Sequence, residues 1–77
     1  MKREWRVIYT FPTTTDAIYM EHVCKVNSLP GRMIPTPTQI TAGCGLAWSA
    51  PIEERERLSR EAESSGIRID GIYRLEL

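Results

Sequence analysis

The chain is short of the residues that mark several large classes of protein. It has one histidine and two cysteines among 77 residues, which is too few donors for a self-contained structural zinc site. No apolar run approaches the roughly 18 residues that a membrane-spanning helix needs. No long apolar segment follows the N-terminal residues as it would in a secretion signal. We therefore expect a cytoplasmic protein whose two thiols are reduced.

An excess of charge of one sign is also lacking. Ten lysines and arginines balance ten aspartates and glutamates, so the chain has no net field that would draw in nucleic acid or an anionic membrane. We expect neither as a partner. The sequence also has no repeat, no low-complexity tract and no linker between domains. Residues 1–77 are therefore predicted to be one small folding unit with a small core.

Hydrophobic periodicity divides the chain into six elements. Alternation predicts strands, and capping residues followed by apolar stripes predict helices. In chain order these are a strand at 5–11, a helix at 14–27, strands at 32–36 and 45–50, a helix from 51 to just before Gly66, and a strand at 67–77. With right-handed crossovers this order most simply gives an α+β, ferredoxin-like βαββαβ sandwich, a four-stranded antiparallel sheet with two helices on one face.

Prolines and alternation add detail to this fold. Pro35 and Pro37 cannot donate ladder hydrogen bonds, so the strand at 32–36 is predicted at an edge of the sheet. Pro51 is predicted in the first turn of the second helix, where its missing N–H is not needed. The last strand is expected to keep one phase, with these apolar residues on one face: Ile67, Ile69, Tyr73, Leu75 and Leu77.

The strongest candidate for chemistry is Cys44, which has a glycine on each side. Gly43 and Gly45 remove the side chains that would screen the thiol and let backbone N–H groups approach it. A structural cysteine would gain nothing from that exposure, because free cysteines usually behave as small buried hydrophobes. The alternative is that both glycines only supply the positive φ of a tight hairpin, with an incidental cysteine between them.

In the expected fold, the hairpin that carries Cys44 lies at the end of the sheet where the first helix begins. Thr13, Thr14 and Thr15 stand at that helix start, and the positive end of a helix favours a thiolate over a thiol. We therefore predict an exposed, nucleophilic Cys44 whose thiolate is supported by its two neighbouring glycines and by these threonines.

Other side chains are weaker candidates. Cys24 lies on the apolar stripe of the first helix, which indicates a core residue, with a resolving thiol or a second carrier site as the alternative. His22 faces another direction on that helix and is expected at the surface. Trp5 and Tyr9 share a strand face that could stack bases, but the aromatic signature of RNA-binding sheets is missing.

Several spaced motifs together resemble one known family. They are Thr10-Phe11-Pro12-Thr13 with Asp16-Ala17, then Pro30-Gly31-Arg32-Met33-Ile34-Pro35-Thr36-Pro37, then Gly43-Cys44-Gly45-Leu46-Ala47, and Gly71-Ile72-Tyr73. Over nearly the whole chain they are similar to the Se/S carrier-like family. The resemblance implies a carrier of reduced sulfur or selenium on a cysteine, and it carries over to Cys44 only. Better-understood sulfur-relay carriers have a Cys-Pro-x-Pro element before a helix, whereas Cys44 precedes Gly45 and a strand.

Two function classes follow from these observations. In the first, Cys44 accepts a persulfide or selenium adduct from a cysteine desulfurase or a selenocysteine lyase and passes it to a sulfur-relay acceptor protein. In the second, the chain is a non-catalytic adaptor or small-ligand-sensing module, whose strand at 32–36 or aromatic face binds a partner. No general base, oxyanion hole, metal cluster or phosphate loop is visible in the sequence. We therefore expect no cofactor beyond the covalent adduct, and a stoichiometric carrier rather than an enzyme.

Overall fold

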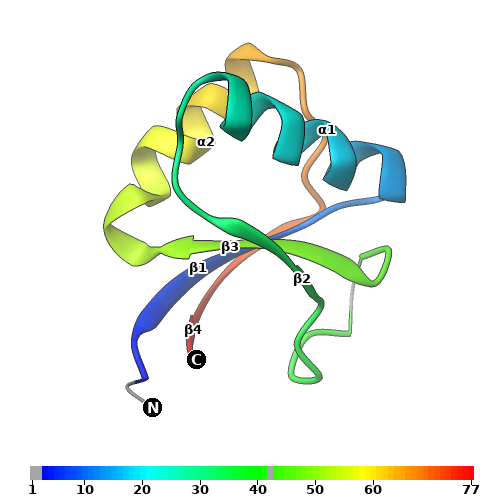
Figure 1. The fold of residues 1–77 in the computed structure, drawn as a ribbon. Helices are drawn as coiled ribbons and strands as arrows, with labels where there is room; N and C mark the ends of the chain where they lie inside the picture. The colour runs from blue at the N-terminus through cyan, green and yellow to red at the C-terminus, as the bar shows by residue number, and fades with distance from the viewer. Residues whose placement is uncertain (1–2, 42) are drawn as a thin grey trace.

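The computed structural model describes residues 3–41 and 43–77 and follows the predicted order of elements. The elements are β1 (Trp5–Thr10), α1 (Thr14–Val26), β2 (Arg32–Pro35), β3 (Leu46–Pro51), the 3₁₀ turn η1 (Ile52–Glu54), α2 (Arg55–Ser64) and β4 (Gly71–Glu76). The strands lie in the order β2-β3-β1-β4, and each neighbouring pair is antiparallel. Both helices cover the same face of this sheet (Figure 1). The predicted ferredoxin-like α+β fold is confirmed.

The edges of the sheet are β2 and β4. β2 pairs with β3 from Arg32 opposite Ser49 to Pro35 opposite Leu46. Pro35 is the last residue of the strand and Pro37 lies beyond it, so neither proline interrupts a central ladder. The prediction that these prolines mark an edge strand is confirmed.

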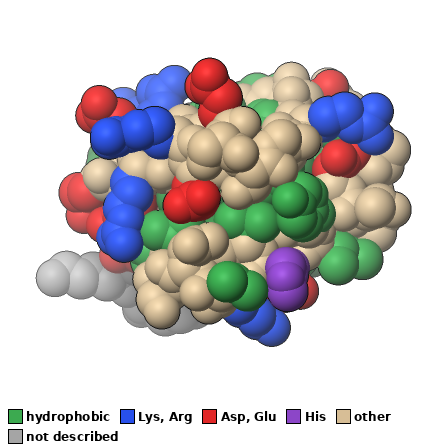
Figure 2. All heavy atoms as spheres, turned by 90° about the horizontal axis from the view of Figure 1, so that it is seen from above, with side chains coloured by type: hydrophobic (Ala, Val, Ile, Leu, Met, Phe, Trp, Pro, Cys, Tyr) green, Lys and Arg blue, Asp and Glu red, His purple; other side chains and the backbone are tan. Residues whose placement is uncertain are grey.

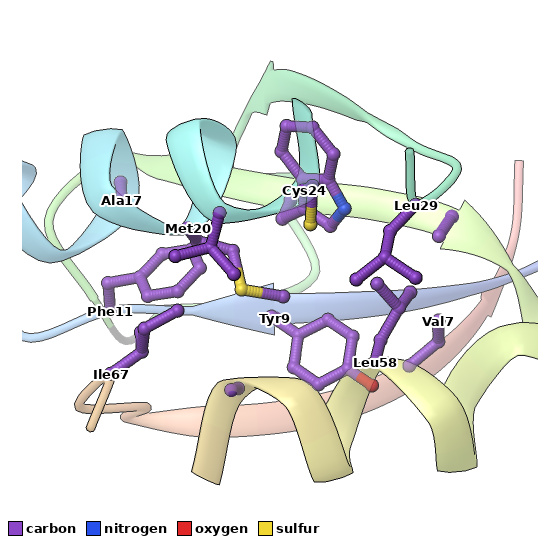
Figure 3. Packing of buried hydrophobic residues seen from close by; sticks show 13 residues of the cluster. Val7, Tyr9, Phe11, Ala17, Met20, Cys24, Leu29, Leu58 and Ile67 are labelled. Carbon is purple, nitrogen blue, oxygen red and sulfur yellow. The ribbon is translucent and has the colours of Figure 1, made fainter. Parts of the chain in front are cut away.

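The main core lies between the sheet and the helices. The alternation of β1 directs Val7 and Tyr9 into this layer, followed by Phe11, and all three are fully buried. Met20 of α1 and Leu58 of α2 pack against them, and Figure 3 shows these side chains gathered between the two helices and β1. Because burying a large apolar side chain is worth about 1.5–3 kcal/mol relative to leaving it exposed, this layer holds both helices on the sheet.

The C-terminal end of α1 has a well-defined cap. Asn27 is the C-cap residue, so the helix ends where the sequence predicts. Ser28 follows with a positive φ of 55°, and its N–H donates to the carbonyl of Lys25 at 3.3 Å. The N–H of Leu29 donates to the carbonyl of Cys24 at 2.8 Å. These two bonds form a Schellman motif in which serine takes the place usually held by glycine.

The start of the second helical segment differs from the prediction. Pro51 is the last residue of β3 rather than a residue of the first helical turn, and the chain passes through η1 before α2 begins. With φ at −57° and ψ at 141°, Pro51 has an extended backbone, which its ring permits as readily as a helical one. Within residues 3–41 and 43–77, no helix has both the length and the apolar character needed to cross a lipid bilayer.

The predicted last strand consists of two segments with opposite phases. Ile67 and Ile69 pack against the main core on the helix side, whereas Tyr73 and Leu75 pack on the other face of the sheet. The chain bends at residue 70, and β4 begins only at Gly71. A Cβ atom on Gly71 would lie 2.7 Å from Cε1 of Tyr73, so a side chain at this position would require the Tyr73 ring to shift. The expectation of one continuous phase is wrong because the bend separates the two apolar pairs.

The face of the sheet that points away from the helices, called the outer face below, has a cluster of its own. Ile8 and Ala47 are fully buried there because Ile40, from the connection between β2 and β3, packs against them. Three partly buried side chains complete this cluster, namely Ile34, Tyr73 and Leu75. The connection between β2 and β3 therefore contributes an apolar anchor to the outer face.

Candidate functional site around Cys44

Cys44 lies near the end of the connection from β2 to β3, two residues before β3 begins. Gly43 and Gly45 have φ values of 93° and 96°, a region that residues with side chains rarely occupy. The N–H of Thr36 donates to the carbonyl of Gly45 at 2.9 Å, which holds the two sides of the connection together just beyond the paired strands. Both glycines therefore have a backbone role, whatever the role of the thiol between them.

Gly43 also makes a close approach to β1. A Cβ atom on Gly43 would lie 3.0 Å from Cβ of Thr10 and 3.4 Å from the carbonyl oxygen of Phe11. The strand exit at Thr10 and Phe11 leads directly to Thr13, the N-cap of α1. The loop that carries Cys44 and the N-terminus of α1 consequently lie at the same end of the molecule (Figure 1).

The thiol of Cys44 is less exposed than the sequence suggests. Its side chain is half-buried and packs against the main core. The Sγ–H donates to the carbonyl oxygen of Leu46, with a donor–acceptor distance of 3.7 Å, which is a weak hydrogen bond because a thiol is a weak donor. Cys44 is a free cysteine. The thiol thus lies at the boundary between the core and solvent.

The threonines at the start of α1 divide into two kinds. The hydroxyl of Thr13 is fully engaged, since it donates to Oδ2 of Asp16 at 2.6 Å and accepts the N–H of Asp16 at 3.2 Å. Thr14 and Thr15 are exposed and occupy the first helical turn, whose N–H groups have no partner within a helix. No hydrogen bond among the described residues joins Cys44 to these threonines. Their support of a thiolate remains a prediction.

An ion pair found only in the structure lies at the same helix end. Asp16 is buried, and its Oδ2 atom accepts a hydrogen bond from Nη2 of Arg68 at 3.1 Å. The hydrogen bond from Thr13 and the nearby Arg68 guanidinium hold the pKa of the Asp16 carboxyl below its usual range, although burial opposes them. Sequence reasoning places Asp16 at the helix start but offers no signal for Arg68, because the two residues are far apart in the chain.

The second thiol has a different environment. Cys24 is only 1% exposed and belongs to the main core, where Figure 3 shows it on α1 among the packed side chains. Burial, with a smaller contribution from the Glu61 carboxylate, raises the pKa of this thiol to about 11. The prediction that Cys24 is a core residue is confirmed, and its thiol is protonated at neutral pH.

The remaining candidates offer little chemistry. His22 is exposed on α1, and the only histidine of the chain stands at the surface of the helix layer in Figure 2. Tyr9 is fully buried and donates its hydroxyl to the carbonyl of Arg55 at 2.9 Å. The guanidinium of Arg74 covers the ring of Trp5 at 4.0 Å, so Trp5 and Tyr9 form no stacking platform. Within residues 3–41 and 43–77 no three His, Cys, Asp or Glu side chains group as metal ligands.

Comparison with known proteins adds one finding. The family model described as "Putative Se/S carrier protein-like" matches residues 6–74. This range starts in β1, ends in β4 and contains Cys44, so the similarity covers nearly the whole fold. The comparison with curated proteins finds no match, and the comparison with solved structures finds none either.

Proposed function

Because this chain belongs to the Se/S carrier protein-like family, we propose that it carries sulfur or selenium as a covalent adduct on Cys44. The observation that supports this choice of residue is the contrast between the two thiols. Cys44 is half-buried at the edge of the core, whereas Cys24 is fully buried inside it. Of the two thiols, Cys44 is therefore the one that a donor protein and an acceptor protein can both approach.

The loading step is a thiol–disulfide type of exchange. The Cys44 thiolate attacks the terminal sulfur of a donor persulfide, a bond forms between the two sulfur atoms, and the S–S bond of the donor breaks. The electron pair of the broken bond leaves on the donor cysteine as a thiolate, which takes up a proton. A donor with a terminal selenium atom reacts in the same way. The step is a transfer at constant oxidation level, so it needs no added oxidant or reductant.

The local structure suits a thiol that must hold its cargo and then release it. Packing against the main core shields one side of Cys44, which limits the access of water and oxidants to an adduct. The hydrogen bond from the Cys44 thiol to the carbonyl oxygen of Leu46 is long, at 3.7 Å. Replacing the thiol hydrogen by an adduct therefore costs little stability. The N-terminus of α1 lies at the same end of the molecule and favours a negative charge nearby.

This chemistry needs two protein partners, one that donates the sulfur or selenium atom and one that accepts it. A pyridoxal-phosphate enzyme of the cysteine desulfurase or selenocysteine lyase class is the proposed donor, because such enzymes generate a terminal sulfur or selenium atom. A sulfur-relay protein with its own nucleophile is the proposed acceptor. The chain therefore acts stoichiometrically, as one loaded thiol per molecule, and turns over only together with its partners.

The test is transfer of labelled sulfur under anaerobic conditions. The protein is incubated with a cysteine desulfurase and labelled cysteine, and its intact mass is measured before and after reduction. We expect an adduct of one sulfur atom that reductant removes, in the wild type and in the Cys24→Ala control. The Cys44→Ser variant should remain unloaded.

Two results would overturn the proposal. Loading of Cys44→Ser at the wild-type level would mean that another residue carries the adduct. If the wild type stays unloaded while a known carrier is loaded in the same mixture, Cys44 and its two glycines serve only the structure of the hairpin. The chain would then be a non-catalytic adaptor or ligand-sensing module.

A further inference from the structure

The outer face of the sheet carries a cavity that the carrier function does not use. Its volume is about 320 Å³, and its lining comes from the two residues before β1, the start of β1, β2, the middle of β3 and the last residue of the chain. These lining residues are Arg3, Glu4, Arg6, Arg32, Ile34, Ser49 and Leu77. The cavity lies on the opposite face of the sheet from the core against which Cys44 packs, so it is separate from the proposed carrier site.

The strand register explains why arginines meet there. Arg32 is directly opposite Ser49 in the pairing of β2 with β3, and Ser49 is opposite Ile8 of the outer face in the pairing of β3 with β1. Arg6 is two residues before Ile8 and therefore shares that face. Side chains from three neighbouring strands thus converge on Ser49, which is itself only 2% exposed.

One of the arginines is held in place by the protein. Nε of Arg6 donates to Oγ of Ser49 at 3.0 Å, and Nη2 donates to the backbone carbonyl of Ser49 at 3.3 Å. Nη1 forms an ion pair with Glu4 at 2.7 Å. The Arg6 side chain is 14% exposed, so its guanidinium is a fixed, largely desolvated charge at the floor of the cavity.

The charges of the lining do not balance. Glu4 is the only acidic side chain among the lining residues, and it is already paired with Arg6. Arg3 and Arg32 form no ion pair with a carboxylate of the described residues. Guanidinium groups that lie close together without counter-charges repel one another. Ile34 and Leu77 add apolar side chains to the lining, and a low-dielectric wall strengthens the electric field inside a cavity. With the terminal carboxylate of Leu77 counted beside Glu4, three guanidinium groups stand against two carboxylates in the lining, so an excess of positive charge remains.

We propose that this cavity binds a small phosphate-class oxyanion, held by the guanidinium groups of Arg3 and Arg32, which pair with no carboxylate of the described residues. The guanidinium fork matches the oxygen geometry of a phosphoryl group and binds it through two parallel hydrogen bonds. A volume of about 320 Å³ is at the lower end of the range of small-molecule sites. It admits inorganic phosphate or the phosphoryl group of a small monoester, but not a large ligand.

The test is a titration of isotope-labelled protein followed by backbone amide shifts, with inorganic phosphate and with phenyl phosphate at constant ionic strength. We expect saturable shifts at Arg32, Ile34 and Ser49 with a dissociation constant on the order of 1 mM. Tighter binding of phenyl phosphate would identify a monoester as the ligand, and tighter binding of inorganic phosphate would identify the free ion. Either result supports the site.

Variants separate this site from general charge effects. Arg32→Gln and Arg3→Gln should each weaken phosphate binding by about tenfold, and neither residue is part of the core. The matched control is Arg57→Gln, on α2 and outside the cavity, which should bind as the wild type does. Three results would overturn the proposal. They are shifts that sodium chloride reproduces, unchanged binding by Arg32→Gln, and binding of a short polyglutamate peptide in the absence of any phosphate binding.

Discussion

Gly43 and Thr10 meet across the end of the sheet, where a Cβ atom on Gly43 would lie 3.0 Å from Cβ of Thr10. Thr10 is fully buried and sits between Ala47 of β3 and Gly71 of β4, so it cannot move away from an added atom. This contact fixes the loop of Cys44 against β1. The position of the thiol relative to α1 therefore depends on a residue that has no side chain.

Substitution of the two glycines should separate contact from backbone strain. Gly43→Ala and Gly45→Ala both place a side chain at a positive φ, which costs about 1–2 kcal/mol of stability. Only Gly43→Ala also meets Thr10, since nothing lies within 4 Å of a Cβ atom on Gly45. We expect Gly43→Ala to lose about 1–2 kcal/mol more than Gly45→Ala. Urea unfolding measures both, and equal losses would show that the contact with Thr10 relaxes freely.

The C-terminus of α1 offers a stabilising substitution. Ser28 has a positive φ of 55° at the position of the Schellman motif where glycine is preferred. Ser28→Gly should raise the free energy of unfolding by about 0.5–1 kcal/mol, because glycine adopts this conformation without strain. Ser65, the C-cap of α2, has a φ of −90°, so Ser65→Gly is the matched control and should bring no gain. A gain in Ser65→Gly as large as in Ser28→Gly would contradict the argument from φ.

The pair of Asp16 and Arg68 predicts a pH dependence of stability. The hydrogen bond from Thr13 and the Arg68 guanidinium lower the pKa of Asp16 in the folded state. Its contribution to stability is therefore present above the unfolded pKa of about 3.9 and is lost as the pH falls through the lower folded value. Asp16→Asn should flatten the acid limb of a plot of stability against pH while changing its slope little near neutral pH.

Arg68→Gln tests the role of the second partner. The hydrogen bond from Thr13, the largest single cause of the lowered Asp16 pKa, remains in this variant, so the acid limb should shift only partly toward that of Asp16→Asn. Urea midpoints measured across the acid range would show this. If the acid limb is identical in the wild type and in Asp16→Asn, another carboxyl group is responsible for the loss of stability at low pH.

The fold was predictable from the sequence because its signals are local and consistent. The alternation of β1, the cap at Thr13 and the edge prolines each indicate the observed element, and the element order then leaves one simple topology. The predictions were wrong at two positions where the local sequence does not determine the backbone conformation. Pro51 fits the end of a strand as well as a first helical turn, and the bend before Gly71 places Tyr73 and Leu75 on the opposite face from Ile67 and Ile69.

The candidate site was predictable in part. The two glycines beside Cys44 correctly indicate a special backbone, since both have positive φ. The half-buried state of the thiol was not foreseen, because it results from packing against the main core. The arginine cavity has no sequence signature at all, since Arg3, Arg6 and Arg32 come together only through the register of β1, β3 and β2.

The thiols should differ in their rates of alkylation. Burial raises the pKa of Cys24 to about 11, so at pH 7 roughly one molecule in ten thousand has this thiol as the reactive thiolate. The same burial blocks the approach of a reagent, since Cys24 is 1% exposed. Cys44 is half-buried and at the edge of the core, so we expect it to react with iodoacetamide at least about tenfold faster than Cys24.

Single-cysteine variants make this comparison direct. Cys24→Ala leaves only Cys44, and Cys44→Ala leaves only Cys24, so the mass of the alkylated protein reports one thiol at a time. Labelling of Cys24 should occur mainly through transient opening of the core and should therefore accelerate in mild denaturant, whereas labelling of Cys44 should change little. A Cys44 that reacts no faster than Cys24 in native buffer would mean that its packing against the core closes it to partners. The carrier proposal would then lose the observation on which it rests.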